Sequence, residues 1–204
     1  MSFSVAVLAS GTGSNLQALL DTVHGRDGIE IVCVGSNRAD AQALQRARDA
    51  GVETGVFAAD NYDGREARDA AMVAWLEERG VELVVLAGFM EILSPAFIRP
   101  FQGRIVNVHP SLLPAFPGLR SIEQALDYGV RVTGVTVHFV EEGVDSGPIV
   151  LQEAFDLPYH RDIEAVETRV HQIEHELLPR AVRLIAAGDV HVDGRQVRIR
   201  DGAG

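Results

Sequence analysis

Short apolar runs alternate with helix-like segments through the first two thirds of the sequence, and this alternation constrains the fold more than any other feature. The apolar runs, each bounded by turn residues, lie at 3–9, 30–34, 53–57, 82–87 and 105–108. Helical periodicity predicts helices between the earlier runs, at 15–23, 41–50 and 65–79. Strands that alternate with helices form parallel sheets through right-handed crossovers. The pattern therefore predicts a doubly wound, Rossmann-like α/β fold whose mostly parallel sheet is flanked by helices.

The pattern changes after Gly129. Two β-rich runs, 132–140 and 148–156, are joined by a polar stretch that contains glycine, which predicts antiparallel strands in the C-terminal part of the sheet.

In the earlier helix at 65–79, the apolar positions recur on one face, which is formed by Ala67, Ala70, Ala71, Ala74 and Trp75.

The last third of the sequence predicts one long helix and a hairpin. The helix is expected at about 163–187, interrupted by Pro179. Asp193 and Gly194 predict a tight turn between strands at 190–192 and 196–199.

The basic residues are all arginine: 18 arginines and no lysine stand against 29 acidic residues. The absence of lysine excludes a Schiff-base lysine, a pyridoxal phosphate anchor, a Ser-Lys dyad and a phosphate loop ending in Gly-Lys-Ser/Thr, because each needs an amine on a flexible stem. The formal charge of −11 disfavours nucleic acid or an anionic membrane as the main partner. Small-molecule substrates are favoured.

Cysteine and hydropathy patterns constrain the compartment. Cys33 is the one cysteine, so a disulfide within the chain and a cysteine-based zinc site are excluded, and the residue is expected to be buried. The first apolar run lacks a positively charged flank and a cleavage site. No apolar run approaches the roughly 20 residues that span a bilayer. We therefore expect a cytoplasmic globular protein.

A glycine-rich turn follows the first predicted strand and opens the first helix. Its residues are Ser10, Gly11, Thr12, Gly13, Ser14 and Asn15. Glycines allow close backbone approach and helix N-termini attract anions, so the turn is a candidate phosphate cradle. Leu16 stands where a dinucleotide fingerprint would have its third glycine. Two alternatives are an NADP-dependent reductase that uses 36–38 at the 2′-phosphate, and a plain turn in which Ser14 or Asn15 caps the helix.

Two polar side chains end the fifth predicted strand. Asn107 and His109 are two residues apart and so project to the same side, and Pro110 stops the strand. An amide and an imidazole that face one point can stabilise the oxyanion of a tetrahedral intermediate and move a proton, as acyl transfer requires. The alternative is a structural histidine bonded to neighbouring backbone.

The stretch between the two later strands is acidic and carries Glu141, Glu142 and Asp145. A carboxylate held close to His109 would favour the imidazolium form of the histidine and orient its ring. Asp145, which is flanked by Gly143 and Gly147, is the best candidate. The alternative is a solvated loop.

Residues 171–175 read His-Gln-Ile-Glu-His and fit the H-x-x-E-H pattern of some zinc peptidases. The apolar stripe of this helix is predicted from Val166, Val170, Ile173 and Leu177. His171 and His175 lie off that stripe, whereas Glu174 borders it. A third zinc ligand could come only from an aspartate near the end of the sequence. We therefore expect no metal here, and we expect Glu174 to contact substrate.

Together these motifs resemble the phosphoribosylglycinamide formyltransferase family, the folate-dependent transformylases of de novo purine synthesis. The likeness runs from about residue 5 to residue 188 and rests on Ser-Gly-Thr-Gly-Ser-Asn-Leu-Gln-Ala-Leu (10–19), Leu-Ala-Gly-Phe-Met-Glu-Ile-Leu (86–93), Asn-Val-His-Pro-Ser-Leu-Leu-Pro (107–114), Val-His-Phe-Val (137–140) and the Asp145 loop. The resemblance implies one formyltransferase domain at 1–188, with a phosphate-binding half at about 1–100, a folate and catalytic half at about 101–188, and a hairpin and tail at 189–204.

The resemblance also implies ligand sites. The catalytic residues would be His109, Asn107 and Asp145, with Asp145 raising the pKa of His109. Glycinamide ribonucleotide would bind at Gly11, Thr12, Gly13, Ser14, Asn15, His171, Gln172, Ile173 and Glu174. The cosubstrate 10-formyltetrahydrofolate would lie against Arg65, Met90, Glu91, Ile92, Leu93, Asn107, Glu141, Glu142, Gly143, Val144 and Asp145. No metal is implied, and a monomer or homodimer is expected.

The sequence departs from the family pattern at a few positions. Bacterial relatives commonly carry arginine where Glu91 stands, lysine where Ala115 stands, and histidine within 120–122. Two other functions stay open: a formyltetrahydrofolate hydrolase, which normally has an extra N-terminal domain, and a noncatalytic nucleotide-binding module. A methionyl-tRNA formyltransferase is not expected, because it would need a further RNA-binding domain and a basic surface.

Overall fold

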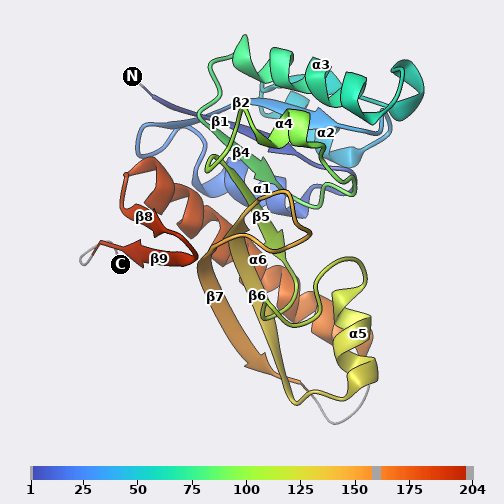
Figure 1. Ribbon diagram of the computed structural model, residues 1–204, viewed down its shortest axis with the longest axis vertical. Helices are drawn as coiled ribbons and strands as arrows, with labels where there is room; N and C mark the ends of the chain where they lie inside the picture. The colour runs from blue at the N-terminus through green and yellow to red at the C-terminus, as the bar shows by residue number, and fades with distance from the viewer. Residues whose placement is uncertain (1, 158–161, 201–204) are drawn as a thin grey trace. The chain divides into compact units, whose positions relative to one another are not determined.

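The computed structural model describes residues 2–157 and 162–200 (Figure 1). The chain forms two compact units, Met1–Asn107 and Val108–Gly204. Strand β5 (Ile105–His109) begins in the first unit and ends in the second. Within the described residues, no helix is long and apolar enough to cross a membrane.

The first unit alternates strands and helices along the chain. Its elements before β5 are β1 (Phe3–Leu8), α1 (Ser14–Thr22), β2 (Ile29–Ser36), α2 (Gln42–Asp49), β3 (Glu53–Val56), the 3-10 turn η1 (Ala59–Asn61), α3 (Arg65–Glu77), β4 (Leu83–Leu86) and the short helix α4 (Pro95–Ile98). The strands pair in parallel in the order β3-β2-β1-β4-β5. The chain moves outward from β1 to β3 and then returns to β4, so the strand order reverses between β1 and β4. Open α/β sheets bind ligands at such a point, beyond the carboxyl ends of the strands.

Helix α3 buries mainly a different face from the one on which its alanines recur. Ala67, Ala70 and Ala74 are exposed, Ala71 and Trp75 are half-buried, and the buried positions are Arg68, Asp69, Met72, Val73 and Leu76. The alanine face is not the main buried face because alanine gains little from burial, whereas the larger side chains remove more apolar area from water. The buried face also contains an arginine beside an aspartate, which a search for apolar periodicity does not detect.

The second unit contains the antiparallel part of the fold. Its elements after β5 are α5 (Ser121–Tyr128), β6 (Val132–Phe139), β7 (Ile149–Asp156), α6 (Ile163–Ala186), β8 (Val190–Asp193) and β9 (Gln196–Ile199). Strands β6 and β7 pair antiparallel, α6 packs against both, and β8 and β9 form the predicted hairpin. The predicted fold class, a mostly parallel α/β sheet with antiparallel strands in the C-terminal part, is confirmed. Helices α4 and α5 were not predicted.

Helix α6 runs through Pro179 without a break, so the predicted interruption was wrong. Proline has no N–H to donate to the carbonyl one turn earlier, which costs about 3 kcal/mol inside a helix. Burial on both sides of Pro179 offsets this cost, because the neighbouring inward positions are apolar: Ile173, Leu177, Leu178, Ala181 and Val182.

Candidate active site

The glycine-rich turn leaves β1 and starts α1 with Gly13 at the N-cap, in the left-handed region (φ 73°). A Cβ on Gly13 would lie 2.8 Å from the Cα and Cβ of Ala43, so both the conformation and the close approach require glycine. A Cβ on Gly11 would have no atom within 4 Å. The N-cap residue is Gly13 rather than Ser14 or Asn15, and it offers no side chain to cap the first turn. These helical amides suit a phosphate oxygen.

Helix α2 holds this turn from one side. Nε of Arg46 donates to the Thr12 carbonyl (2.8 Å), and NH1 of Arg46 donates to Oε1 of Gln17 (3.0 Å). The backbone N–H of Ala43 donates to the Gly11 carbonyl (3.1 Å). The carbonyls of Gly11 and Thr12 therefore accept hydrogen bonds from α2, and the amides at the start of α1 are of the kind that suits an anion.

Some of the predicted folate residues of the first unit are exposed to solvent, and others are buried or held by an ion pair. Arg65 is exposed at the start of α3. Met90 and Ile92 are 67% and 64% exposed, and Leu93 between Ile92 and Ser94 is buried. The Glu91 carboxylate is held in an ion pair with Arg68 (3.0 Å).

Asn107 is the last residue of the first unit. It lies in β5 opposite Leu86 of the parallel neighbour β4, and it is half-buried. Two residues later, β5 ends at His109 in the second unit.

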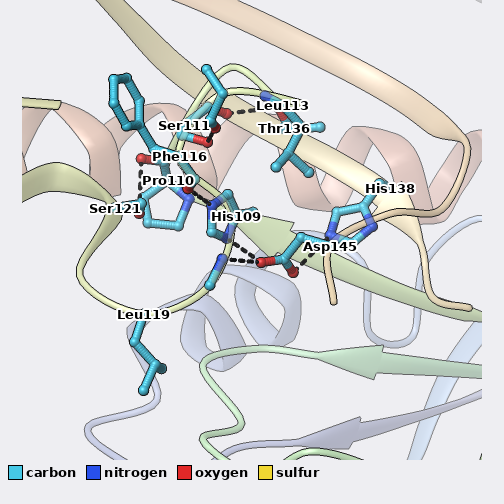
Figure 2. A network of polar contacts seen from close by, with 12 residues as sticks. His109, Pro110, Ser111, Leu113, Phe116, Leu119, Ser121, Thr136, His138 and Asp145 are labelled. Carbon is cyan, nitrogen blue, oxygen red and sulfur yellow. Dashed lines mark hydrogen bonds and ion pairs between the residues drawn. The ribbon is translucent and has the colours of Figure 1, made fainter. Parts of the chain in front are cut away.

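His109 is a buried imidazole that faces a carboxylate (Figure 2). Its Nδ1 lies 3.4 Å from Oδ2 of Asp145, and Oδ1 of Asp145 lies 3.6 Å from Nε2 of His138. The backbone N–H of Gly118 donates to Oδ2 of Asp145 (2.7 Å). Asp145 thus lies between two imidazoles, one at the end of β5 and one on β6.

The second nitrogen of each imidazole is bonded to a backbone carbonyl. Nε2 of His109 is 2.8 Å from the oxygen of Phe116, and Nδ1 of His138 is 2.8 Å from the oxygen of Phe139. A carbonyl only accepts, so Nδ1 of His138 carries a proton, and in the neutral ring of His109 the proton is on Nε2. Nδ1 of His109 then presents a lone pair towards Asp145. A proton taken up at that atom would be shared with the carboxylate.

Burial controls the charge of this histidine. It lowers the pKa of His109 below the ordinary 6.5; the bond to Phe116 and the charge of Asp145 act in the opposite direction but are outweighed, and His138 lowers the pKa further. Asp145 therefore raises the pKa of His109, as the resemblance implied, although burial outweighs this contribution. Burial alone would raise the pKa of Asp145, but bonds from His138 and the Gly118 amide, with the charge of His109, hold it at about 2. At neutral pH the site pairs a neutral imidazole with a carboxylate.

Two residues of this network have strained backbone. Phe116 (φ 50°) and Asp145 (φ 47°) are in the left-handed region without being glycine. Such a conformation costs on the order of 1 kcal/mol and persists where the surrounding structure fixes it. Here it places the Phe116 carbonyl on Nε2 of His109 and the Asp145 carboxylate near Nδ1.

The loop at 110–120, which supplies the Phe116 and Gly118 backbone groups, is anchored on β6 and β7. The Thr136 hydroxyl donates to the Ser111 carbonyl (2.7 Å) and accepts from the Leu113 N–H (3.1 Å). Nε2 of Gln152 donates to the Leu113 carbonyl (2.8 Å). The strands therefore fix the loop and, through it, the orientation of the histidine.

The remaining predicted contacts differ in exposure. The acidic-loop residues Glu141, Glu142, Gly143 and Val144 are exposed. On α6, Ile173 and Glu174 are buried whereas His171 and Gln172 are exposed, so these four residues divide between two faces of the helix.

The H-x-x-E-H segment places its two histidine rings in a stack rather than around a point. The ring centroids of His171 and His175 are 6.2 Å apart, with an interplanar angle of 7°. Over residues 2–157 and 162–200, no group of three or more His, Cys, Asp or Glu side chains is placed to hold a metal ion.

The sequence interpretation assigned no role to His138 or Arg68. His138 lies in the Val-His-Phe-Val motif, and its position on a buried strand just before the acidic loop was the available signal. Arg68 had no comparable signal, because it follows Arg65 by three residues in a charged helix start and resembles a solvated side chain.

Comparison with known proteins gives one consistent result. The formyl transferase family model matches residues 3–182. The chain is 42% identical over 185 residues to phosphoribosylglycinamide formyltransferase of Haemophilus influenzae, covering 90% of this chain and 87% of that one. It is 48% identical over 189 residues to the trifunctional purine biosynthetic protein adenosine-3 of Bos taurus, covering 92% of this chain but only 19% of that relative's length. The crystal structure of glycinamide ribonucleotide transformylase 1 from Symbiobacterium toebii superposes with a TM-score of 0.95 at 46% identity, covering 98% of this chain and 95% of that one.

Proposed function

The chain belongs to the formyl transferase family, and we propose that it transfers the formyl group of 10-formyltetrahydrofolate to the amine of N1-(5-phospho-D-ribosyl)glycinamide in de novo purine (IMP) synthesis. The products are the N-formyl nucleotide and tetrahydrofolate. The observation that carries this proposal is the buried His109, 3.4 Å from Asp145 and two residues after Asn107, in a chain similar to phosphoribosylglycinamide formyltransferases over about nine tenths of its length.

The proposed reaction needs no nucleophile from the protein. The substrate amine attacks the formyl carbon, and the carbonyl oxygen becomes an oxyanion that the Asn107 amide and His109, once Nδ1 has taken up a proton, stabilise. The amine nitrogen loses a proton, the bond from the formyl carbon to the folate nitrogen breaks, and that nitrogen gains a proton. The absence of lysine is compatible with this chemistry, because the reacting amine comes from the substrate.

The network around Asp145 suits the proton movement. Since burial keeps His109 neutral near pH 7, Nδ1 can accept a proton directly or through a water held by Asp145. The nearby carboxylate then compensates the positive charge that develops on the ring. Once the folate nitrogen departs, the same pair can return the proton to it.

The ligand assignments follow the family resemblance. We assign the substrate phosphate to the amides of the turn from Gly11 to Asn15, and further nucleotide contacts to 171–174 on α6. We assign the cosubstrate to Arg65, to 90–93, to Asn107 and to the loop at 141–145. The proposed enzyme works in the cytoplasm without a metal, as a monomer or homodimer.

One spectrophotometric assay separates this function from its alternatives. Consumption of 10-formyltetrahydrofolate is measured with and without glycinamide ribonucleotide. We expect consumption that requires the nucleotide, with one formyl group transferred for each folate consumed. Consumption independent of the nucleotide would instead identify a hydrolase. Ligand binding without consumption would identify a noncatalytic binding module.

A further inference from the structure

The segment between β4 and α4 has no regular secondary structure to fix its shape. It contains the predicted cosubstrate residues 90–93 and presents two apolar side chains, Met90 and Ile92, to solvent. Side chains from elsewhere in the first unit hold its two ends. The Met90 N–H donates to the Ser10 hydroxyl (2.8 Å), and the Ser94 N–H donates to Oδ2 of Asp69 (2.6 Å).

A continuous set of polar contacts joins these two ends. The Ser10 hydroxyl donates to Oδ1 of Asn37 (2.6 Å), and Nδ2 of Asn37 donates to Oε1 of Glu91 (3.0 Å). Oε2 of Glu91 accepts from NH1 of Arg68 (3.0 Å). Nε and NH2 of Arg68 donate to Oδ1 of Asp69 (3.0 and 2.8 Å). The contacts therefore run from the residues that follow β1 and β2, through the segment itself, to α3.

Burial makes this network costly to rearrange. The side chains of Arg68 and Asp69 are 2% and 0% exposed, whereas the Glu91 side chain is 34% exposed. Burial alone would lower the pKa of Arg68, but hydrogen bonds to Glu91 and Asp69 raise it above its ordinary value. A buried guanidinium needs both carboxylates, since losing either leaves a donor or a charge unsatisfied. Glu91 thus bonds inward while its neighbours Met90 and Ile92 point to solvent.

We propose that Glu91 and Arg68 are positioning residues for the cosubstrate: their ion pair, extended by Asn37, sets the shape in which Met90 and Ile92 meet the ring system of the folate. This inference rests on the proposed function, because it takes 10-formyltetrahydrofolate as the ligand of the segment. It assigns Glu91 a role through Arg68 and Asn37 rather than a direct ligand contact. The role of Ser10 follows from its two bonds, which tie the start of the cosubstrate segment to the residue before Gly11.

The test compares Glu91→Gln with the matched control Glu53→Gln. Glu53 is paired with Arg79 in the same unit, so the control removes the same charge from an ion pair outside the network. For Glu91→Gln we expect the KM for 10-formyltetrahydrofolate to rise about tenfold, because one charge-assisted hydrogen bond is lost. The KM for the nucleotide should stay within about twofold of the wild-type value. We expect Glu53→Gln to change neither KM. Equal rises in both KM values, or none, would overturn the proposal.

Asn37→Ala and the double variant Asn37→Ala/Glu91→Gln test the network independently of how well one variant folds. Residues that act through one network give effects that do not add. We therefore expect the double variant to have a cosubstrate KM close to that of Glu91→Gln, and a KM equal to the product of the single effects would overturn the proposal. Calorimetric measurement of tetrahydrofolate binding tests the positioning role of Glu91 separately from the proposed formyl transfer. Loss of affinity in Glu91→Gln supports the positioning role even if the wild type forms no formylated nucleotide, and unchanged affinity contradicts it.

Discussion

The two units each contain a buried polar network beside the residues assigned to ligands, but the networks are made of different groups. In the first unit, the guanidinium of Arg68 stays charged near neutral pH, because hydrogen bonds to Glu91 and Asp69 raise a pKa that is already far above neutrality. In the second, Asp145 lies between the imidazoles of His109 and His138, and the imidazole of His109 can take up and release a proton. Fixed charges can hold a shape but cannot pass a proton. Damage to the first network should therefore affect stability and KM, and damage to the second should affect kcat and its pH dependence.

The largest effect is expected from Asp145→Asn. The amide keeps the size of the side chain but removes the charge that compensates a protonated His109. We expect kcat/KM for formyl transfer to fall about 10²- to 10⁴-fold. The measurement is the spectrophotometric assay, with circular dichroism to compare thermal midpoints.

Asp156→Asn is the matched control, because Asp156 is an exposed aspartate on β7 of the same unit. Its kcat/KM should equal that of the wild type. Formyl transfer by Asp145→Asn near the parent rate would contradict the catalytic assignment of the second network.

Arg68→Met tests the opposite side of the comparison. Methionine fills similar space without charge and leaves Asp69 and Glu91 without their cation. Breaking a buried ion pair costs about 3–5 kcal/mol, and we expect the lower end because Glu91 is partly exposed. The measurement is the free energy of unfolding in urea.

Arg38→Met provides the control, since Arg38 and Asp40 form an exposed pair in the same unit. The urea midpoint of this variant should not move. A similar loss in both arginine variants would show that burial of Arg68 is unimportant.

The glycine turn gives a smaller and more selective prediction. The Cβ added by Gly11→Ala would have no protein atom within 4 Å, so the free energy of unfolding should be unchanged. The added methyl group would, however, keep a phosphate from approaching the backbone closely. We expect the nucleotide KM to rise about tenfold and the cosubstrate KM to stay constant. Gly13→Ala should instead lower the thermal midpoint, because its φ of 73° and the contact with Ala43 both oppose a side chain. Equal rises in the two KM values of Gly11→Ala would contradict the phosphate assignment.

The alternation of apolar runs was sufficient to predict the parallel sheet, and the fold class was confirmed. The pattern failed where a side chain's role depends on tertiary partners. The alanine face of α3 repeats at helical spacing but is not the main buried face, because Met72 and Leu76 bury more area than the alanines. Pro179 suggests an interruption locally, yet α6 passes through it because packing outweighs one lost bond. The short helices α4 and α5 have too few turns to show a period.

The candidate site, like the fold, could be predicted only in part. Asn107 and His109 could be identified because a strand end and a period of two place them without tertiary information. Asp145 could be proposed only as a candidate, and the structure places it 3.4 Å from His109. Asp145 raises the pKa of His109 as expected, but the larger lowering by burial could not be predicted, since the extent of burial of His109 is not visible in sequence. The ligand assignments stay predictions.

His138→Gln gives the smallest effect and the sharpest test of the contrast between the two networks. Burial places the pKa of His109 below 6.5, so kcat/KM of the wild type should fall on the acid side below that pH. The folded state holds fewer protons on His109 than the unfolded state does, so the stability contributed by this group is complete above pH 6.5 and decreases as the pH falls towards the folded pKa.

A charge on His138 lowers the pKa of His109, so its removal should move the acid limb of kcat/KM to higher pH, by less than about one unit, with little change at pH 8. Glu91→Gln, in the fixed-charge network, should leave the limb where it is. An acid limb of kcat/KM that stays in place in His138→Gln, or that moves in Glu91→Gln, would contradict the contrast. It would show that proton transfer does not belong to the second network alone or positioning to the first.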